Sequence, residues 1–318
     1  MSFVKITGYG HYLPDRIMTN KELSQNIDTS DEWITSRTGI KQRHIAEDAQ
    51  NTSDLATYAL RDALYHSGAK TEDLDGIIVA TTTPDLYMPS TAVIVQKKIG
   101  LEHGFAFDIQ AVCSGFIYAL NIAYSMIKAG QAKKIAVIGA EVMSRIVDWN
   151  DRNTCVLFGD GAGAVIVSDS DINNGIIGVN ISSDGNFIDI LKANGGLSAG
   201  NLTGKLQMDG KEVFKFAIDK MTSSITSILE TNSLLLSQLD WIVPHQANAR
   251  IINTLSERIN FSHDKIALTI DKHANTSAAS IPLALSCYIK NQLLKKGNLV
   301  ALTAVGAGMT WGAALLRI

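Results

Sequence analysis

The sequence has few cysteines, and their placement excludes two classes of protein. Its 318 residues include three cysteines, Cys113, Cys155 and Cys287, which lie far apart and form no Cys-x-x-Cys pair. An odd number of scattered cysteines argues against a disulfide framework and against a cysteine-rich zinc site. We therefore expect a reducing, cytoplasmic compartment, which suits a working thiol.

Long apolar runs and an excess of basic residues are also missing. No apolar run reaches the ~18 residues that a membrane-spanning helix needs, so we expect no membrane span. Residues 1–5 lack the apolar core of a signal peptide. The formal net charge of −3 argues against a general role at nucleic acids or membranes. The histidines show no metal-ligand spacing, so we expect no metal.

Apolar residues make up 46% of the chain and charged residues 19%, which is enough for a large core. Predicted strands at 4–10, 74–80 and 133–140, and one that follows a glycine turn within 156–167, alternate with helical patterns, such as the amphipathic stretch 53–67 that Gly68 ends. This alternation predicts an α/β protein in which helices cover the sheets.

The second half of the chain repeats the plan of the first. The predicted strands 239–245, 265–269 and 298–303 mirror, in turn, 74–80, the strand before Cys113 and 133–140. Asp75 precedes Ile135 by 60 positions and Asp240 precedes Leu299 by 59; 21 positions separate Cys113 from Lys134 and Asn275 from Lys296. We predict a duplicated domain with a pseudo-twofold axis and halves 1–170 and 171–318.

The duplication predicts where a site forms. It makes Cys113 and Asn275 equivalent, each at the start of a buried helix, and it puts His245 in the place of Ala80, just past a strand end. Sites in open α/β sheets gather at such strand ends. A thiol, an imidazole and a carboxamide are therefore expected to converge on one cavity between the halves.

The segment 107–116 around Cys113 predicts a strand, a tight turn and a buried helix. A thiol at a helix start meets unpaired N–H groups and the positive end of the helix dipole, which favour the thiolate. The alternative is that Cys113 is a small residue of the core, since free cysteines are often buried. This segment alone does not decide between them.

Three other motifs have a structural and a functional interpretation. His245, in 243–248, is either a site residue or the cap of a turn. Asn275, in 273–282, is a site residue or a helix cap. The glycine-rich segment 305–312 is a hairpin turn or a donor of backbone N–H groups to a ligand. The glycines of 159–163 lead into a strand, so we interpret them as a turn and not as a nucleotide-binding loop.

Taken together, these motifs closely resemble the β-ketoacyl-acyl carrier protein synthase III family, initiating condensing enzymes of bacterial fatty acid synthesis in the thiolase superfamily. The resemblance runs along the whole chain, and the matching segments are 29–34, 37–40, 111–116, 157–164, 244–248 and 275–282. It implies a duplicated five-layer αβαβα thiolase fold and a homodimer. It also implies condensation of an acyl-CoA primer, expected to be acetyl-CoA, with malonyl-acyl carrier protein.

The resemblance implies a role for each matching residue. Cys113 is the acyl-accepting nucleophile, His245 and Asn275 bind the malonyl thioester carbonyl, and the backbone N–H groups of Cys113 and Ala307 form the oxyanion hole. No cofactor is implied, because the coenzyme A thioester is a substrate. The residues implied to bind coenzyme A are Thr29, Trp33, Arg37, Arg152, Gly210, Phe214, Ala247 and Asn248. Those implied to dock the acyl carrier protein are Lys215, Gln246, Arg250 and Arg258.

Three positions depart from the family pattern. Ala307 and Ala274 stand where glycine is common, and Met88 stands where relatives often have phenylalanine reaching across the dimer into the acyl pocket. Primer length is therefore left open. A relative from secondary metabolism and a catalytically silent subunit of a condensing complex are the alternative functions.

Overall fold

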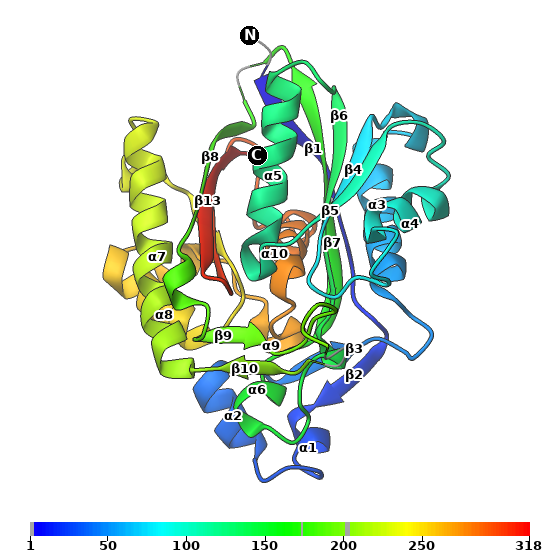
Figure 1. Cartoon of the computed structure of the whole chain (residues 1–318). Coiled ribbons are helices and arrows are strands. Elements are labelled where there is room, and N and C mark those ends of the chain that lie inside the picture. Colours follow the sequence, from blue (N-terminus) through cyan, green and yellow to red (C-terminus); the bar gives the residue numbers. More distant parts are fainter. Residues whose placement is uncertain (1–2, 173, 201–203) are drawn as a thin grey trace.

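Two β-sheets form the frame of the structure, a computed structural model that describes residues 3–172, 174–200 and 204–318 (Figure 1). The first sheet runs in the order β1 (Phe3–Tyr12), β7 (Asp160–Ser170), β6 (Lys134–Val142), β4 (Gly76–Ala80) and β5 (Phe105–Ile109). The second runs in the order β11 (Trp241–Pro244), β12 (Leu299–Gly306), β13 (Thr310–Arg317) and β8 (Ile176–Ser183).

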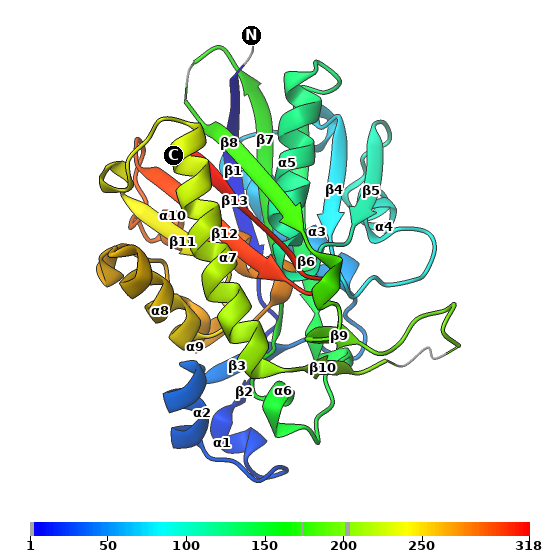
Figure 2. The same ribbon diagram turned by 60° about the vertical axis from the view of Figure 1, so that its left-hand side comes forward.

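Helices form three layers around the two sheets. Two of them, α5 (Gly115–Lys128) and α10 (Ser280–Lys290), lie between the sheets (Figure 1). The outer face of the first sheet is covered by α3 (Thr52–Ser67) and α4 (Thr91–Ile99). The outer face of the second is covered by α7 (Gly210–Thr231) and α8 (Ala249–Ile259), and Figure 2 shows α7 crossing it. This is the five-layer αβαβα arrangement that the family resemblance implied, and it agrees with the helix-covered sheets that the sequence pattern predicted.

Side-chain alternation explains why the central strands are apolar throughout. Along β4, Ile77 and Val79 pack against the α3 and α4 layer, whereas Ile78 and Ala80 pack into the central layer. Successive side chains of a strand point to opposite faces, so a sheet with helices on both sides needs apolar residues at every position.

The predicted repeat is confirmed by the connections within the two sheets. In the first, β4 pairs in parallel with β6 and β6 antiparallel with β7; in the second, β11 pairs in parallel with β12 and β12 antiparallel with β13. The carboxylate of Asp75 accepts the N–H of Lys134 at 2.9 Å, and that of Asp240 accepts the N–H of Leu299 at 2.8 Å. Equivalent residues of the two halves are thus 165 positions apart.

One predicted strand is wrong. Residues 265–269 form no strand, and only Ile266 makes a single parallel bridge, to Ile242. The N–H of Ala267 donates to the carbonyl of Ile242 at 2.8 Å, but the two donors after it go to side chains: the N–H of Leu268 to the hydroxyl of Tyr288 at 2.7 Å, and that of Thr269 to the amide of Gln246 at 2.9 Å.

Shorter elements gather at the lower end of the molecule in Figure 1. They are β2 (Arg16–Thr19), β3 (Gln42–Ile45), β9 (Leu191–Ala193), β10 (Leu206–Met208), α1 (Asn20–Leu23), α2 (Asp31–Thr38), α6 (Arg152–Cys155) and α9 (Ile270–His273). The single 3-10 turns are η1 (Thr71–Asp73), η2 (Val112–Ser114), η3 (Met143–Arg145), η4 (Gly185–Phe187), η5 (Leu236–Gln238), η6 (His263–Lys265) and η7 (Ser277–Ala279).

Two further predictions hold. The amphipathic stretch 53–67 is α3, and Gly68 ends it in the left-handed conformation with φ of 68°. The glycines of 159–163 lead into β7 and open no helix. Gly163 is needed there for packing, because a Cβ at this position would lie 2.5 Å from the backbone nitrogen of Leu283 in α10.

Candidate functional site

One cavity of about 240 Å³ is lined by Cys113, His245 and Asn275 together. All three side chains are buried, with exposed fractions of 6%, 3% and 5%. They come from the helix start after β5, the end of β11 and the loop before α10, which are separate parts of the chain. The convergence expected from the repeat is therefore present in the fold.

The turn that carries Cys113 is held by the β12–β13 hairpin. A Cβ on Gly306 would lie 2.8 Å from the backbone nitrogen of Cys113, so only glycine lets β12 come this close. The hydroxyl of Ser114 donates to that of Thr310 at 2.7 Å, and Thr310 donates to the carbonyl of Ala111 at 3.0 Å. The segment 305–312 is a hairpin, as one of its two interpretations predicted, and its tip adjoins the turn that carries Cys113.

Burial sets the resting state of the thiol. It raises the pKa of Cys113 to about 12; a hydrogen bond from Ser277 opposes the rise and the nearby Glu141 carboxylate adds to it. The start of α5 favours the thiolate, but here burial outweighs it, so Cys113 rests as a thiol.

His245 follows directly on β11, and its backbone N–H donates to the carbonyl of Thr303 at 2.8 Å. Its ring nitrogen Nδ1 lies 2.6 Å from the hydroxyl oxygen of Ser280, the first residue of α10. Burial lowers the pKa of His245 to about 3, so the imidazole is neutral near pH 7. One ring nitrogen is therefore a donor and the other an acceptor.

Asn275 is fixed through its backbone and through one end of its amide. Its N–H donates to the carbonyl of Leu157 at 2.9 Å, and its carbonyl accepts the N–H of Gly159 at 3.0 Å. The side-chain oxygen accepts the N–H of Ser277 at 2.9 Å, which leaves the Nδ2 hydrogens to donate. Ala274, with φ of 56°, occupies a conformation that favours glycine, so the alanine there is strained.

The predicted equivalence of Cys113 and Asn275 is wrong by three residues. The turns η2 and η7 begin with Val112 and Ser277, which have φ of 48° and 50° and are 165 positions apart. The counterpart of Cys113 is therefore Ala278. His245 does take the place of Ala80, as predicted.

Trp33 and Arg37 line the cavity, and Arg152, which does not line it, lies over the same indole. The guanidinium carbons of Arg37 and Arg152 lie 4.8 and 4.9 Å from the centroid of Trp33. Thr29 lies just before α2 but does not line the cavity, and its hydroxyl has no hydrogen-bond partner among the described residues. The remaining residues implied to bind coenzyme A line the cavity wall: Gly210, Phe214, Ala247 and Asn248. Among those that the sequence did not suggest are Asn153, Leu191 and Met208.

A basic rim surrounds a shallow surface pocket beside the cavity mouth. Lys215 and Arg250 line it, together with Lys211, which the sequence analysis missed. The guanidinium of Arg250 lies 5.8 Å from the ring centroid of Phe214. Arg258 lies outside this pocket and pairs with Asp219 at 3.2 Å.

Gln246 is misplaced in the predicted docking surface. It is 1% exposed, and its amide donates to the carbonyls of Pro244 and Ala267 at 2.8 and 3.1 Å. Its oxygen accepts the N–H of Thr269. With all these groups bonded inside the protein, Gln246 holds the loop after β11 and does not face a partner.

A second cavity reaches Cys113 from the other side. It has a volume of about 430 Å³, and the residues that line it between Cys113 and the surface include Met143, Ile146, Phe158, Leu206, Tyr87 and Ala307. Ala307 does not have a positive φ, so an alanine is unstrained there. Cys113 thus lies where two cavities meet.

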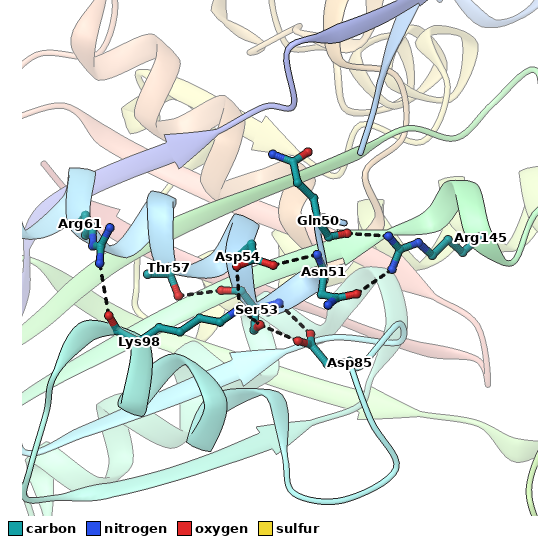
Figure 3. A network of polar contacts seen from close by, with 9 residues as sticks. All are labelled: Gln50, Asn51, Ser53, Asp54, Thr57, Arg61, Asp85, Lys98 and Arg145. Carbon is teal, nitrogen blue, oxygen red and sulfur yellow. Dashed lines mark hydrogen bonds and ion pairs between the residues drawn. The ribbon is translucent and has the colours of Figure 1, made fainter. Parts of the chain in front are cut away.

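Met88 projects from the protein. It is 82% exposed, and it lies in the loop after Asp85, outside both cavities of its own chain. Figure 3 shows how the base of this loop is anchored. The carboxylate of Asp85 accepts the N–H and the hydroxyl of Ser53 at 2.8 and 2.5 Å, and Lys98 donates to Ser53 and to Asp54.

A buried carboxylate joins the loop after β4 to the turn before α10. Glu141 is fully buried and accepts hydrogen bonds from the backbone of Thr82 and Thr83 and from the hydroxyl of Ser277 at 3.1 Å. Burial raises its pKa. No motif pointed to it, since its hydrogen-bond partners come from two distant segments, residues 81–83 and Ser277.

Within the described part of the chain, no three His, Cys, Asp or Glu side chains are placed to hold a metal ion. Over the same residues, no helix is both long and apolar enough to cross a membrane. All three cysteines are free.

Comparison with known proteins gives consistent matches. Sequence models of 3-oxoacyl-[acyl-carrier-protein (ACP)] synthase III and of its C-terminal part match residues 107–185 and 229–318. The chain is 54% identical to a β-ketoacyl-[acyl-carrier-protein] synthase III of Ehrlichia canis over 314 residues, 98% of each chain, and 53% identical to one of Wolbachia pipientis over 99% of each.

Solved structures agree with these sequence matches. The crystal structure of a 3-oxoacyl-[acyl-carrier-protein] synthase III from Aquifex aeolicus is 46% identical, with a TM-score of 0.96 over 99% of this chain and 100% of that one. The priming β-ketosynthase of the R1128 polyketide pathway is 32% identical, with a TM-score of 0.95 over 99% of this chain and 96% of that one.

Proposed function

The chain belongs to the β-ketoacyl-acyl carrier protein synthase III family, and from this premise we propose how its residues carry out the family's reaction. The enzyme is an acyltransferase that condenses an acyl-CoA primer with malonyl-acyl carrier protein and so starts fatty acid synthesis. The products are 3-oxoacyl-acyl carrier protein, CO₂ and coenzyme A. The reaction needs no cofactor, because coenzyme A takes part as a substrate. The observation that carries the proposal is the shared cavity of Cys113, His245 and Asn275.

In the first step, the Cys113 sulfur attacks the thioester carbon of the primer, which we propose is acetyl-CoA. The new carbon–sulfur bond replaces the bond to coenzyme A, which leaves with the thiol proton of Cys113. The backbone N–H groups of Cys113 and Ala307 stabilise the oxyanion. The acyl-enzyme makes the kinetics ping-pong.

In the second step, malonyl-acyl carrier protein binds and its terminal carbon–carboxylate bond breaks. CO₂ leaves, and the electron pair remains as an enolate whose oxygen accepts hydrogen bonds from His245 and Asn275. The free Nδ2 hydrogens of Asn275 and the neutral state of His245 support this donor role. The enolate carbon then attacks the acyl carbon, the bond to Cys113 breaks, and the released thiolate takes up a proton from water.

The two cavities suit two parts of the substrates. The first cavity takes coenzyme A, and Trp33, Arg37 and Arg152 contact its adenine, with Thr29 near them. The pantetheine lies along the cavity wall formed by Gly210, Phe214, Ala247 and Asn248. The second cavity takes the acyl chain. Lys211, Lys215 and Arg250 dock the acidic carrier protein at the basic rim, with Arg258 beyond it, since local charge steers encounter even in a chain of net charge −3.

The exposure of Met88 supports a homodimer in which this side chain reaches the partner's acyl cavity. An exposed apolar side chain on an anchored loop is typical of a surface that contacts another protein chain. We propose that residues 1–170 supply the nucleophile and 171–318 the decarboxylating pair. The free thiols favour a cytoplasmic, reducing compartment.

Incubation with acetyl-CoA followed by mass spectrometry of the Cys113 peptide tests the proposal. We expect one acetyl group on Cys113; an unmodified peptide in folded protein would contradict it. The likeness to a polyketide priming enzyme supports a second candidate, in which another malonyl donor is used. Comparing malonyl-acyl carrier protein with malonyl-CoA as the extender separates the two.

A further inference from the structure

The second half of the chain has a polar pair where the first half has none. Ser280 and His245 are 165 positions after Gly115 and Ala80, and these four residues make the same contact in the two halves. A Cβ on Gly115 would lie 3.1 Å from that of Ala80, and in the second half the Ser280 hydroxyl lies 2.6 Å from His245 Nδ1. The contact between Gly115 and Ala80 is therefore apolar, whereas the equivalent contact between Ser280 and His245 is a hydrogen bond to the imidazole.

The direction of this hydrogen bond follows from what else surrounds Ser280. Its oxygen accepts the N–H of Gln246 at 3.3 Å. Among residues 3–172, 174–200 and 204–318, the acceptor placed for its hydroxyl hydrogen is Nδ1 of His245. Ser280 is 2% exposed, so a hydroxyl hydrogen that pointed elsewhere would stay without a partner. The hydroxyl therefore donates and Nδ1 accepts.

We propose that Ser280 is a positioning residue that holds His245 in the tautomer with its hydrogen on Nε2. This deepens the proposed function and rests on it, because that hydrogen is the one offered to the enolate oxygen. The same tautomer makes Nε2 unable to take the proton of Cys113. His245 then acts in the decarboxylation step and not in activation of the nucleophile.

The burial of His245 explains why its tautomer, and not its charge, determines what the ring can do. It keeps the pKa of His245 low, so the ring carries a single hydrogen near neutral pH and its place decides what the ring can do. A serine in reach of Nδ1 fixes that place without adding charge to the cavity.

The first test reads the tautomer directly and needs no activity. Nitrogen NMR of the full-length protein with labelled histidines, with the His245 signals assigned by their loss in His245→Ala, is expected to show Nδ1 without hydrogen and Nε2 with it. Hydrogen on Nδ1 in the wild-type protein would overturn the proposal.

The second test compares Ser280→Ala with Ser286→Ala. Ser286 is a matched control, since it lies on the same helix, is also buried, and its hydroxyl makes the same kind of contact with Nδ1 of His11 at 2.9 Å, away from both cavities. We expect Ser280→Ala to lower the single-turnover rate of CO₂ release from malonyl-acyl carrier protein by about 10- to 100-fold. This loss is smaller than the loss from removing a hydrogen-bond donor to the oxyanion, because the imidazole of His245 is still present. Acetylation of Cys113 and the KM for malonyl-acyl carrier protein should change less than about twofold.

The outcomes separate this proposal from the function it rests on. If wild-type protein takes no acetyl group, the proposed function fails, whereas the NMR result still decides the tautomer. If Ser280→Ala and Ser286→Ala release CO₂ at the wild-type rate, Ser280 has no role in positioning and the inference is wrong. Equal slowing of acetylation and decarboxylation in Ser280→Ala would also contradict it.

Discussion

The two halves of the chain share one backbone plan and differ in where their reactive groups lie. In the first half, the group is at the helix start, Cys113, and the strand-end position holds Ala80. In the second half, the strand end holds His245 and the helix-start position holds Ala278. We propose that each half supplies one step of the two-step reaction, because Cys113 from the first half and His245 and Asn275 from the second line the same cavity.

The two halves also differ at the position that lies next to the Cys113 turn. Glu141 and Gly306 are 165 positions apart. Glu141 fills its place with a buried carboxylate bonded to Ser277, whereas Gly306 leaves room for the backbone of Cys113. The two halves therefore share a backbone arrangement, and their side chains at equivalent positions differ.

The largest effect is expected from moving the thiol between the halves. Cys113→Ala should lower condensation by about 10⁴-fold or more, because the covalent step is lost. Adding Ala278→Cys to this variant should restore nothing, since Ala278 lines neither cavity. The measurement is incubation with acetyl-CoA followed by mass spectrometry, and an acetyl group at position 278 of the double variant would show that the two places are interchangeable.

Removing the decarboxylating pair should affect one step only. His245→Ala and Asn275→Ala are each expected to slow CO₂ release by about 10²–10³-fold, the usual cost of one oxyanion donor. Stopped-flow or single-turnover assays should find acetylation of Cys113 nearly unchanged. Loss of acetylation in both variants would break the division of labour.

Gly306→Ala tests the close approach of the halves. The new Cβ would meet backbone atoms of Ala111 and Cys113 at 2.8 Å, so the turn must move. We expect condensation to fall about 10²-fold, as for a displacement near 1 Å, and the free energy of unfolding to fall by about 1–3 kcal/mol. Gly185→Ala, where nothing lies within 4 Å, is the control in both the activity and the denaturant measurements.

The pH dependence distinguishes burial from the helix dipole at Cys113. With the pKa raised to about 12, the thiolate fraction grows about tenfold for each pH unit below that value. Alkylation of Cys113 by iodoacetamide, corrected with Cys113→Ala, should therefore keep rising from pH 7 to pH 9. A plateau below pH 8 would mean that the helix start dominates. His245, with a pKa of about 3, should give no ionisation limb in CO₂ release between pH 5 and 8.

The smallest effect is expected at the surface. Lys215→Glu should raise the KM for malonyl-acyl carrier protein by about two- to fivefold at low salt, the size of an exposed ion pair. Acetylation by acetyl-CoA should not change. Lys70→Glu makes the same charge change at an exposed position outside the basic rim and is the control. An equal rise of the KM in the two variants would mean that the basic rim does not dock the carrier protein.

The sequence predicted the layers and the repeat because strand patterns and their spacing are local properties. It misjudged the register at Asn275, since Lys296 precedes the start of β12 at Leu299 by three residues while Lys134 opens β6. The strand predicted at 265–269 failed because tertiary contacts capture its N–H groups, which no local pattern shows.

The side chains that meet in the shared cavity were likewise predictable, whereas the residues that hold them in place were not. Cys113, His245 and Asn275 stand in recognisable motifs, whereas the contact of Ser280 with His245 links residues 35 positions apart. Gln246 looked like a surface residue because it is polar, yet its amide is bonded inside the protein. The offset of 165 residues leads to Ser280, but it became apparent only from the pairing within the two sheets.

The central claim is that Cys113 takes the acyl group without help from His245 and Asn275, which act afterwards. The most direct test is the double variant His245→Ala/Asn275→Ala, incubated with acetyl-CoA and then with malonyl-acyl carrier protein. We predict that it carries one acetyl group on Cys113, like the wild type, and then releases no CO₂ and forms no 3-oxoacyl product. An unacetylated Cys113 in the folded double variant, or CO₂ release at the wild-type rate, would contradict the account.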